Sequence, residues 1–265
     1  MAKPSAFVID DENGYQLMLP ASQTGYVERD YDRTPYGSVG AAPPGEIEVI
    51  PYDQWPDKIA DLEREKATLK DIWEASPIGV LNQGNYPFCH GFAAIMAVLI
   101  ERAKQGLPYV ELSASSVAAP VTNYTKSGAW IGKDLQQIVK VGVAPLSLIP
   151  MLTHRKSDFP PGWEQEAGKH RVTEFAELRP RDFAQQGSAI LQGHGVSVGQ
   201  NHWSHAVLQM CVRDMDKSKK ATDPNRYGIE LRNSWGAGWG DGGFAIQVGS
   251  KKFADEAYVV RQVIV

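Results

Sequence analysis

The chain is short of three things: cysteine, long apolar runs and positive charge. It has 265 residues but only two cysteines, Cys89 and Cys211, too few for a disulfide framework, which favours a reducing compartment. No run approaches the 18 apolar residues that a membrane-spanning helix needs. The formal net charge of −4 argues against a general nucleic-acid binder, which needs a basic surface. We therefore expect neither a membrane nor a nucleic acid as partner.

The first residues also lack the basic and apolar stretches of a secretory signal peptide. We expect a protein of the cytoplasm, or of a particle assembled there, and not a classically secreted one. Hydrophobic residues make up 43% and charged residues 22% of the chain, which is typical of a folded globular protein. The length permits one large domain or two small ones.

The N-terminal segment differs from the rest of the chain in charge and composition. Residues 1–76 hold 15 acidic and 7 basic residues, a net charge of −8, so residues 77–265 carry +4. Tyrosine, proline and glycine recur over 1–56, which predicts an acidic arm of turns and extended chain. Such an arm is ordered only where contacts offset its ordering entropy. We expect it to dock on the chain's own cleft or on another subunit, and the missing secretory signal favours the second.

Periodic apolar residues predict helices first and strands second. One amphipathic helix is expected within 57–76, running from an N-cap at Asp57 to residue 75 and stopped by Pro77. The clearest helix is expected over 89–105. The remaining expected elements are helices over 133–141 and 180–192 and strands at 196–198, 206–212, 227–233, 243–248 and 257–264. Helices followed by strands favour an α+β fold over repeated βαβ units.

Cys89 is the strongest candidate for a nucleophile. It begins the most regular apolar helix, where unpaired backbone N–H groups and the helix dipole favour a thiolate. A lone cysteine is more often a small buried hydrophobe, so the interpretation depends on its partners. We expect a lowered pKa and fast alkylation at Cys89, and slow alkylation at Cys211 on its predicted strand.

Three other polar residues supply what a thiolate nucleophile requires. His205 opens a predicted strand and can hold the proton that the thiol releases. Asn233 follows the next predicted strand and can fix the tautomer and plane of that imidazole. Gln83 precedes Cys89 by six residues, so its side-chain amide and the Cys89 backbone N–H can together stabilise an oxyanion.

The order and neighbours of these residues resemble the papain-like cysteine peptidases. The resemblance rests on three segments and covers roughly 77–265: NQGNYPFCHGF (82–92), SHAV (204–207) and NSWGAGWGDGGF (233–244). It implies a two-lobed α+β fold, with a helical lobe over 77–150 that carries the nucleophile and a β-rich lobe over 151–265 that carries the histidine and the asparagine. The site is then expected in the cleft between the lobes.

The resemblance also assigns roles to individual residues. Cys89 corresponds to the nucleophile, His205 to the general acid/base, Asn233 to the residue that orients it and Gln83 to the oxyanion donor. The family's pattern further gives Trp235 the role of shielding the histidine–asparagine hydrogen bond. It matches Ser127 and Gly128 to a loop whose backbone binds extended substrate. The implied reaction is peptide-bond hydrolysis of a peptide or protein substrate through an acyl-thioenzyme, with no metal and no organic cofactor.

The chain departs from the family pattern beside the nucleophile. Tyr86 stands where the family has a disulfide cysteine, and Phe88 and His90 flank Cys89. These departures remove no catalytic atom, but they leave a second hypothesis open. A papain-like fold can serve as a structural or assembly module, for example in a phage particle, with weak or no peptidase activity. The tyrosine-rich arm over 1–56 suits such a role, because it could wrap around an assembly partner.

Overall fold

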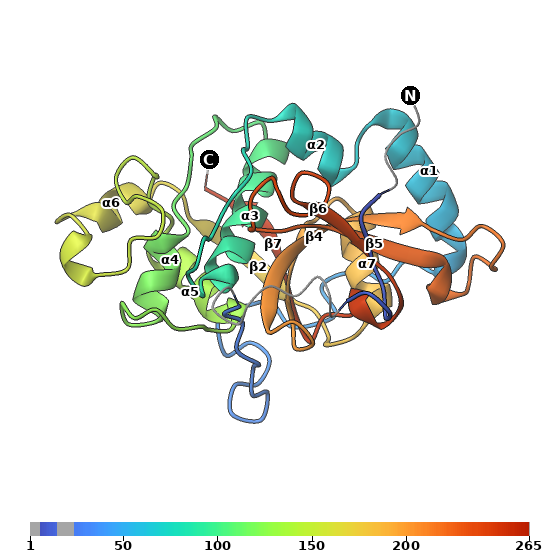
Figure 1. Cartoon of the computed structure of the whole chain (residues 1–265), viewed down its shortest axis with the longest axis horizontal. Helices are drawn as coiled ribbons and strands as arrows, with labels where there is room; N and C mark the ends of the chain where they lie inside the picture. Colours follow the sequence, from blue (N-terminus) through green and yellow to red (C-terminus); the bar gives the residue numbers. More distant parts are fainter. Residues whose placement is uncertain (1–5, 15–23, 265) are drawn as a thin grey trace.

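The computed structural model describes residues 6–14 and 24–264, and the part of the predicted arm over 1–5 and 15–23 lies outside the described residues. Figure 1 shows the green helices toward the left of the molecule and the orange strands toward the right, with further helices beside those strands. The α-helices are α1 (Trp55–Glu65), α2 (Leu69–Ala75), α3 (Cys89–Lys104), α4 (Ser115–Val121), α5 (Ile131–Lys140), α6 (Trp163–Ala167) and α7 (Phe183–Leu191). The strands are β1 (Val8–Ile9), β2 (Val172–Glu177), β3 (Val196–Gln200), β4 (His205–Asp214), β5 (Tyr227–Arg232), β6 (Phe244–Gln247) and β7 (Glu256–Val263).

These strands form one mixed sheet in the order β1-β6-β5-β4-β3-β7-β2. The pairs are antiparallel except for β1 with β6, which are parallel. The central strand β4 pairs with β3 through Gln200 opposite His205, and with β5 through Leu208 opposite Arg232. Because β5 runs antiparallel to β4, the chain leaves β5 beside the start of β4. The sheet therefore brings the segment after Arg232 close to His205.

Two hydrophobic cores lie on either side of β4, since alternate residues of a strand point to opposite faces. Ala206, Leu208 and Met210 join the core that contains α3. Val207 and Val212 join the second core, to which α1 and α7 contribute. With both faces covered, β4 is buried from His205 to Val212, so its first residue is held in a fixed position.

The helix α3 is the central element of the helical side. Fourteen of its sixteen residues, from Cys89 to Arg102, are buried, and it packs against β4, β7 and β3. A helix that is apolar on all sides needs neighbours all round it, which α2, α4, α5 and the sheet supply. The predicted helix over 89–105 is thus confirmed to within one residue, and its N-terminus is fixed against the sheet.

The single helix predicted over 57–75 is wrong: the segment forms α1 and α2, and Asp57 is not the N-cap. The helix α1 begins at Trp55, after Gln54, and ends at Lys66, which has a left-handed φ of 52°. A new helix starts at Thr68, whose side chain accepts from the Asp71 backbone N–H while the Asp71 carboxylate accepts from the Thr68 backbone N–H. This capping box fixes the break, because each side chain satisfies a backbone donor of the other residue.

The predicted α+β order is otherwise confirmed in the described residues, with α5, α7 and the strands from β3 to β7 close to the expected ranges. Sequence periodicity missed β1, β2, α4 and α6. β1, α4 and α6 have two, seven and five residues, too short to show a period. β2 has six residues, but its burial does not alternate, since its last three residues are all buried. No helix among the described residues has the length and apolar character that would let it cross a bilayer.

Replacing Thr68 by alanine tests the helix break. Thr68→Ala removes the capping side chain of α2 and should lower the free energy of unfolding by about 1 kcal/mol. Thr68→Ser keeps the hydroxyl and should stay within about 0.5 kcal/mol of the wild type. Urea unfolding followed by tryptophan fluorescence measures both. Equal stability of the alanine and serine variants would contradict a capping role.

Candidate active site

Cys89 lies at the first residue of α3, where the sequence places it. The preceding residue, Phe88, gives no side-chain cap, so the first backbone N–H groups of the helix are not bonded by a capping side chain. The thiol lies within hydrogen-bonding reach of backbone groups of Ala206, Gly25 and His90. Ala206 directly follows His205 in β4, so the nucleophile candidate and the histidine candidate meet where α3 crosses the sheet.

His205 and Asn233 form the second part of the site. The His205 Nε2 and the Asn233 Oδ1 are 2.8 Å apart, and both residues are fully buried. Since a side-chain carbonyl oxygen only accepts, Nε2 carries the proton and Nδ1 is the unprotonated nitrogen. Nδ1 has no hydrogen-bond partner among the described residues. The Trp235 ring lies 4.3 Å from the His205 ring, centroid to centroid, and is inclined to it by 31°.

The loop before Cys89 is tied to the loop that carries Asn233. The Gln83 backbone N–H donates to Ser234 O at 2.8 Å, and the Ser234 hydroxyl donates to Gln83 Oε1 at 2.7 Å. The Gln83 amide nitrogen donates to Tyr86 O, also at 2.8 Å. These bonds fix the Gln83 amide on the loop that leads into Cys89. The structure thus brings together Gln83, Cys89, His205, Asn233 and Trp235 from distant parts of the sequence.

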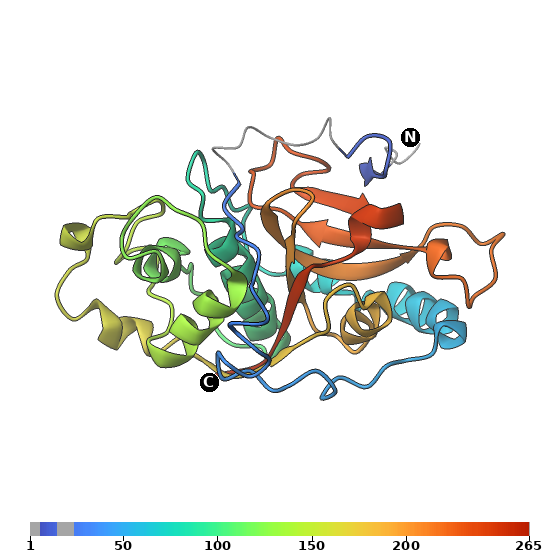
Figure 2. The same ribbon diagram turned by 90° about the horizontal axis from the view of Figure 1, so that it is seen from below.

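The N-terminal arm runs through this site. The Tyr26 backbone N–H donates to Ser204 O at 3.1 Å, directly before His205. On the other side, Val27 N–H donates to Ala129 O at 3.1 Å, and Ala129 N–H donates to Gly25 O at 3.0 Å. Figure 2 shows this part of the arm as a blue trace that runs along the boundary between the green helical part and the orange sheet. Residues 25–27 therefore occupy the position of an extended peptide between the two halves of the molecule.

Glycine permits the close approach of the arm to the site. A Cβ on Gly25 would lie 1.9 Å from Pro87 O, in the loop before Cys89. A Cβ on Gly128 would lie 2.2 Å from Gly25 O. Ala129, which directly follows the pair Ser127 and Gly128 that the resemblance assigns to a peptide-binding loop, makes the backbone hydrogen bonds to the arm. Gly128 gives the room, and the Ser127 hydroxyl instead pairs with Thr125 at 2.8 Å.

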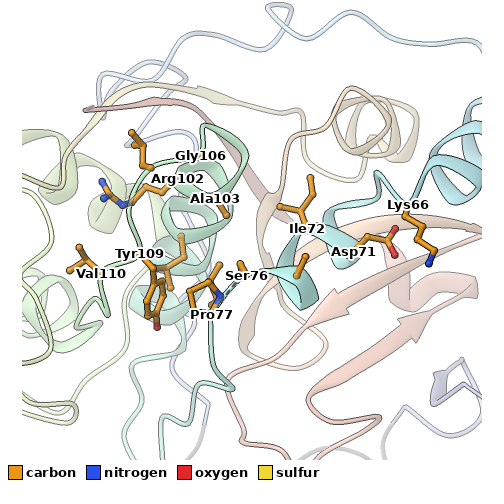
Figure 3. Close-up of a pocket in the computed structure, with 14 residues that line it drawn as sticks. Lys66, Asp71, Ile72, Ser76, Pro77, Arg102, Ala103, Gly106, Tyr109 and Val110 are labelled. Carbon is orange, nitrogen blue, oxygen red and sulfur yellow. Dashed lines mark hydrogen bonds between the residues drawn. The ribbon is translucent and has the colours of Figure 1, made fainter.

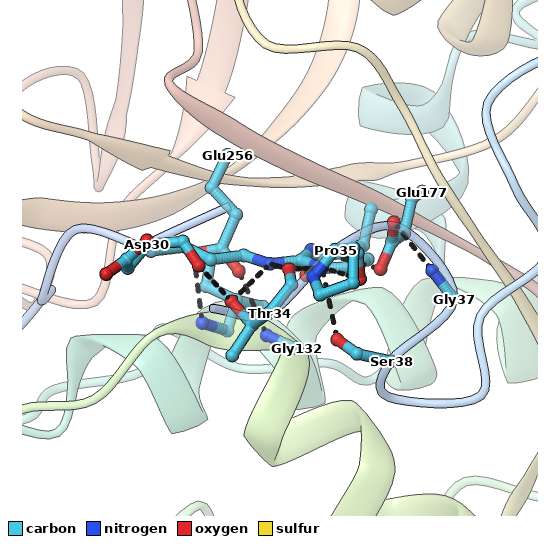
Figure 4. Close-up of polar contacts among 11 residues, drawn as sticks. Asp30, Thr34, Pro35, Gly37, Ser38, Gly132, Glu177 and Glu256 are labelled. Atoms are coloured by element: carbon cyan, nitrogen blue, oxygen red, sulfur yellow. Dashed lines mark hydrogen bonds and ion pairs between the residues drawn. The ribbon is translucent and has the colours of Figure 1, made fainter. Parts of the chain in front are cut away.

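Arg29 anchors the arm beyond the site. Its guanidinium donates to Glu177 at 3.0 Å and to the Tyr258 hydroxyl at 2.6 Å, and the Arg29 and Glu177 side chains are each 1% exposed. It also donates to Thr34 O at 2.7 Å and lies 4.8 Å over the Trp130 ring. Figure 4 shows the arm segment around Thr34 gathered against Glu177 and Glu256. The arm is thus held by a buried ion pair in addition to its backbone bonds.

The arm changes the expected chemistry of the thiol. Burial raises the pKa of Cys89 to about 12, although neighbouring backbone groups oppose that rise. Burial lowers the pKa of His205 to about 4, and the hydrogen bond that His205 donates to Asn233 opposes this shift. The prediction of a low pKa at Cys89 is therefore wrong for the arm-filled state. A low pKa requires an open helix terminus, whereas Cys89 is 0% exposed.

A second buried polar pair lies beside the nucleophile. His90 Nδ1 and Asp134 Oδ2 are 2.7 Å apart, and both side chains are 0% exposed. Asp134 lies on α5, so the pair ties α5 to the N-terminal turn of α3. Sequence reasoning noticed His90 only as a departure from the family pattern. Its partner is 44 residues away, and no local signal identifies it.

An apolar pocket lies elsewhere, between α2 and α3. It has a volume of about 440 Å³ and is lined by residues of α2, by the C-terminal part of α3 and by the loop to Val110. Figure 3 shows Ile72 on one side and Arg102 and Tyr109 on the other. Arg102 is thirteen residues from Cys89 along α3, about 20 Å at the helical rise. This pocket is therefore separate from the site.

No group of three or more metal-ligating side chains occurs in the part of the chain that the structure describes.

Comparisons with known proteins agree with this geometry. No family model matches the chain. Ananain from Ananas comosus is 28% identical over 176 residues, which is 62% of this chain, and the chain spans about 50% of the length of ananain. Xylellain, a cysteine protease from Xylella fastidiosa, superimposes with a TM-score of 0.60 at 19% identity, covering 91% of this chain and 96% of that structure. Digestive procathepsin L2 proteinase from Tenebrio molitor superimposes with a TM-score of 0.66 at 15% identity, covering 95% and 87%. The predicted two-lobed α+β fold of these proteases is confirmed.

The buried thiol predicts slow alkylation of the full chain. Because burial raises the pKa of Cys89 to about 12, the residue is a neutral thiol at pH 7, and its reaction should become faster as the pH rises. We expect iodoacetamide to react slowly with Cys89 at pH 7 and with Cys211, whose pKa burial raises to about 11. Peptide mass spectrometry measures both rates, and unfolding in urea should release both thiols. Fast reaction of Cys89 alone in the native chain would contradict the buried state.

Loss of the Arg29 side chain should open the site. Arg29→Ala leaves the Glu177 carboxylate buried without its partner, which costs about 3 kcal/mol and should speed Cys89 alkylation about 100-fold. Arg33→Ala is the matched control, since Arg33 lies on the same arm with its side chain 88% exposed. The control should leave the rate unchanged. Equal rates in the two variants would refute the anchoring role of Arg29.

Proposed function

We propose that this chain, which has the papain-like fold and resembles the papain-like cysteine peptidases in its motifs, hydrolyses peptide bonds itself. One observation carries the proposal: Cys89 begins α3 against the start of β4, and His205 is held there through Nε2 by Asn233. That bond leaves Nδ1 as the basic nitrogen of the imidazole. A thiol and a fixed imidazole base are the minimum that nucleophilic catalysis by cysteine requires.

In the first half of the reaction, Cys89 transfers its proton to His205 Nδ1 and the sulfur attacks the peptide carbonyl carbon. The carbonyl π electrons move to the oxygen, which the Cys89 backbone N–H and the Gln83 amide stabilise. When the C–N bond breaks, the imidazolium protonates the leaving amine. A thioester on Cys89 and a free amine terminus result.

In the second half, water attacks the thioester and His205 takes its proton. Collapse of the tetrahedral intermediate breaks the C–S bond, and the proton returns from His205 to the Cys89 sulfur. Asn233 and Trp235 transfer no proton. Asn233 keeps the ring in one tautomer, and the Trp235 indole at 4.3 Å keeps water from the hydrogen bond that fixes it. The cycle needs no metal and no organic cofactor.

The arm makes the described state a latent one. Residues 25–27 bond to Ala129 and Ser204, so a peptide or protein substrate meets Cys89 only after the arm has left. The sequence alone favours another subunit as the surface on which the arm docks. The described arm residues instead pack on their own chain, which supports inhibition in cis. Procathepsin L2, matched over 95% of this chain, is named as a proform and agrees with this interpretation.

An enzyme is favoured over an assembly module because xylellain is named a cysteine protease and procathepsin L2 a proteinase. The second reason is that Cys89 lies beside the Ala206 backbone while the preceding residue, His205, is bonded to Asn233. No observation on the described residues favours the module. We propose a reducing, cytoplasmic setting on the sequence argument, with which two buried, unbridged cysteines agree.

Variants of the site in the arm-released background test the proposal. In Arg29→Ala protein, adding His205→Ala should reduce turnover of a fluorogenic peptide at least about 1000-fold. Adding Asn233→Ala should reduce it less, because Asn233 orients the ring without moving a proton. His194→Ala, a half-buried histidine on another segment, is the matched control and should keep activity. Unchanged turnover in the His205→Ala variant would contradict the mechanism.

A further inference from the structure

The buried pair formed by His90 and Asp134 takes no part in the proposed mechanism. His90 Nδ1 and Asp134 Oδ2 are 2.7 Å apart, and both side chains are 0% exposed. The remaining polar atoms, His90 Nε2 and Asp134 Oδ1, have no hydrogen-bond partner among the described residues. Burying such groups is costly, and an apolar pair of similar size is often at least as stable. Stability alone therefore does not explain the pair.

The pair joins two helices that meet at the site. His90 directly follows Cys89 in α3, and Asp134 lies in the first turn of α5. No other hydrogen bond links α3 with α5 within the described part of the chain. The helices otherwise share a core of apolar residues, among them Ile131 and Leu135. Apolar contacts have no preferred direction, so the pair supplies the directional bond between the first turns of the two helices.

The start of α5 also adjoins the backbone that binds an extended peptide. Ala129 lies two residues before α5 and exchanges two backbone hydrogen bonds with the arm, at 3.0 and 3.1 Å. The first two backbone N–H groups of α5 donate to the Glu256 carboxylate on β7, each at 3.2 Å. The N-terminal turn of α5 is therefore held on two sides, toward the sheet by Glu256 and toward the helix of the nucleophile by Asp134.

We propose that His90 and Asp134 are positioning residues, whose bond places the Ala129 backbone, and with it the bound peptide, at the distance from Cys89 that attack requires. Neither side chain transfers a proton in the reaction. A displacement of about 1 Å between reacting atoms can lower a rate about 100-fold, so a bond that fixes two elements at this point has a large effect. The inference rests on the proposed function, because it treats the bound peptide as the substrate.

The first experiment compares two reagents that alkylate Cys89 in full-length Arg29→Ala protein. Chloroacetamide and a tripeptidyl chloromethyl ketone lose the same leaving group, but only the second can bind along the Ala129 backbone. Peptide mass spectrometry measures both labelling rates. Their ratio reports how well a bound peptide is placed against the thiol, because the reactivity of the thiol and the folded fraction affect both rates alike.

Variants of the pair in this background should change the ratio in a defined way. His90→Leu combined with Asp134→Leu removes the bond and should lower the ratio of peptidyl to small reagent at least about tenfold. His90→Asn and Asp134→Asn each keep a donor and an acceptor and should stay within about threefold. Gln186→Leu with Gln209→Leu is the matched control, because it removes another buried side-chain pair, 3.0 Å apart, between α7 and β4. The control should leave the ratio unchanged.

Urea unfolding separates positioning from a purely structural role. The double leucine variant of the pair should unfold at the same urea concentration as its parent or a higher one, because both partners are replaced by apolar side chains of similar size. An unchanged labelling ratio in this variant, whatever its unfolding midpoint, would overturn the proposal. So would a loss of the ratio in the two asparagine variants as large as in the double leucine variant.

Turnover of a fluorogenic peptide by the same proteins distinguishes the two levels of the account. We expect the double leucine variant to lower kcat at least about tenfold and to change KM less than about threefold, because the backbone bonds at Ala129 remain. Turnover at the parent rate by this variant refutes the positioning role but leaves the peptidase standing. Absence of turnover in the Arg29→Ala parent, with the labelling ratios as expected, refutes the proposed function but leaves the positioning role standing.

Discussion

The packing of α3 across the central strands is the constraint on which the site depends. An almost wholly buried helix can be covered only by a sheet and by further helices, and this fixes where its first residue lies. Cys89 is that residue, and β4 begins beside it with His205. The antiparallel pairing of β4 with β5 then brings Asn233 to the histidine. The arrangement of the candidate site is thus a consequence of helix-on-sheet packing and strand register.

The arm packs on the same residues and keeps them covered. The two glycines Gly25 and Gly128 let its backbone reach the site, and Arg29 ties it down through a buried ion pair. Removing water from Cys89 and His205 holds both in their neutral forms, which is the least reactive state of the pair. Loss of one partner of a buried ion pair leaves the other charge buried without compensation, which strongly destabilises the packing around it. Arg29 is therefore an effective point at which the arm can be released.

Much of the site could be predicted from the sequence, because its residues stand in segments with local signals. Cys89 begins a long apolar helix, and His205 and Asn233 stand at strand ends. The part that could not be predicted depends on contacts between distant segments. No local pattern connects Arg29 with Glu177, 148 residues away, or His90 with Asp134. The low pKa expected for Cys89 failed for the same reason, since the groups around its thiol include Gly25 and Ala206, both far from it in the sequence.

Hydrogen exchange of the full-length chain tests the central claim most directly, that the arm lies in its own cleft. The Tyr26 and Val27 amides donate to Ser204 and Ala129, so they should exchange at least about 100-fold more slowly than unstructured amides. This protection should be independent of protein concentration, since the contacts lie within one chain. Exchange of these amides at the unstructured rate, or protection that disappears on dilution, would contradict the account.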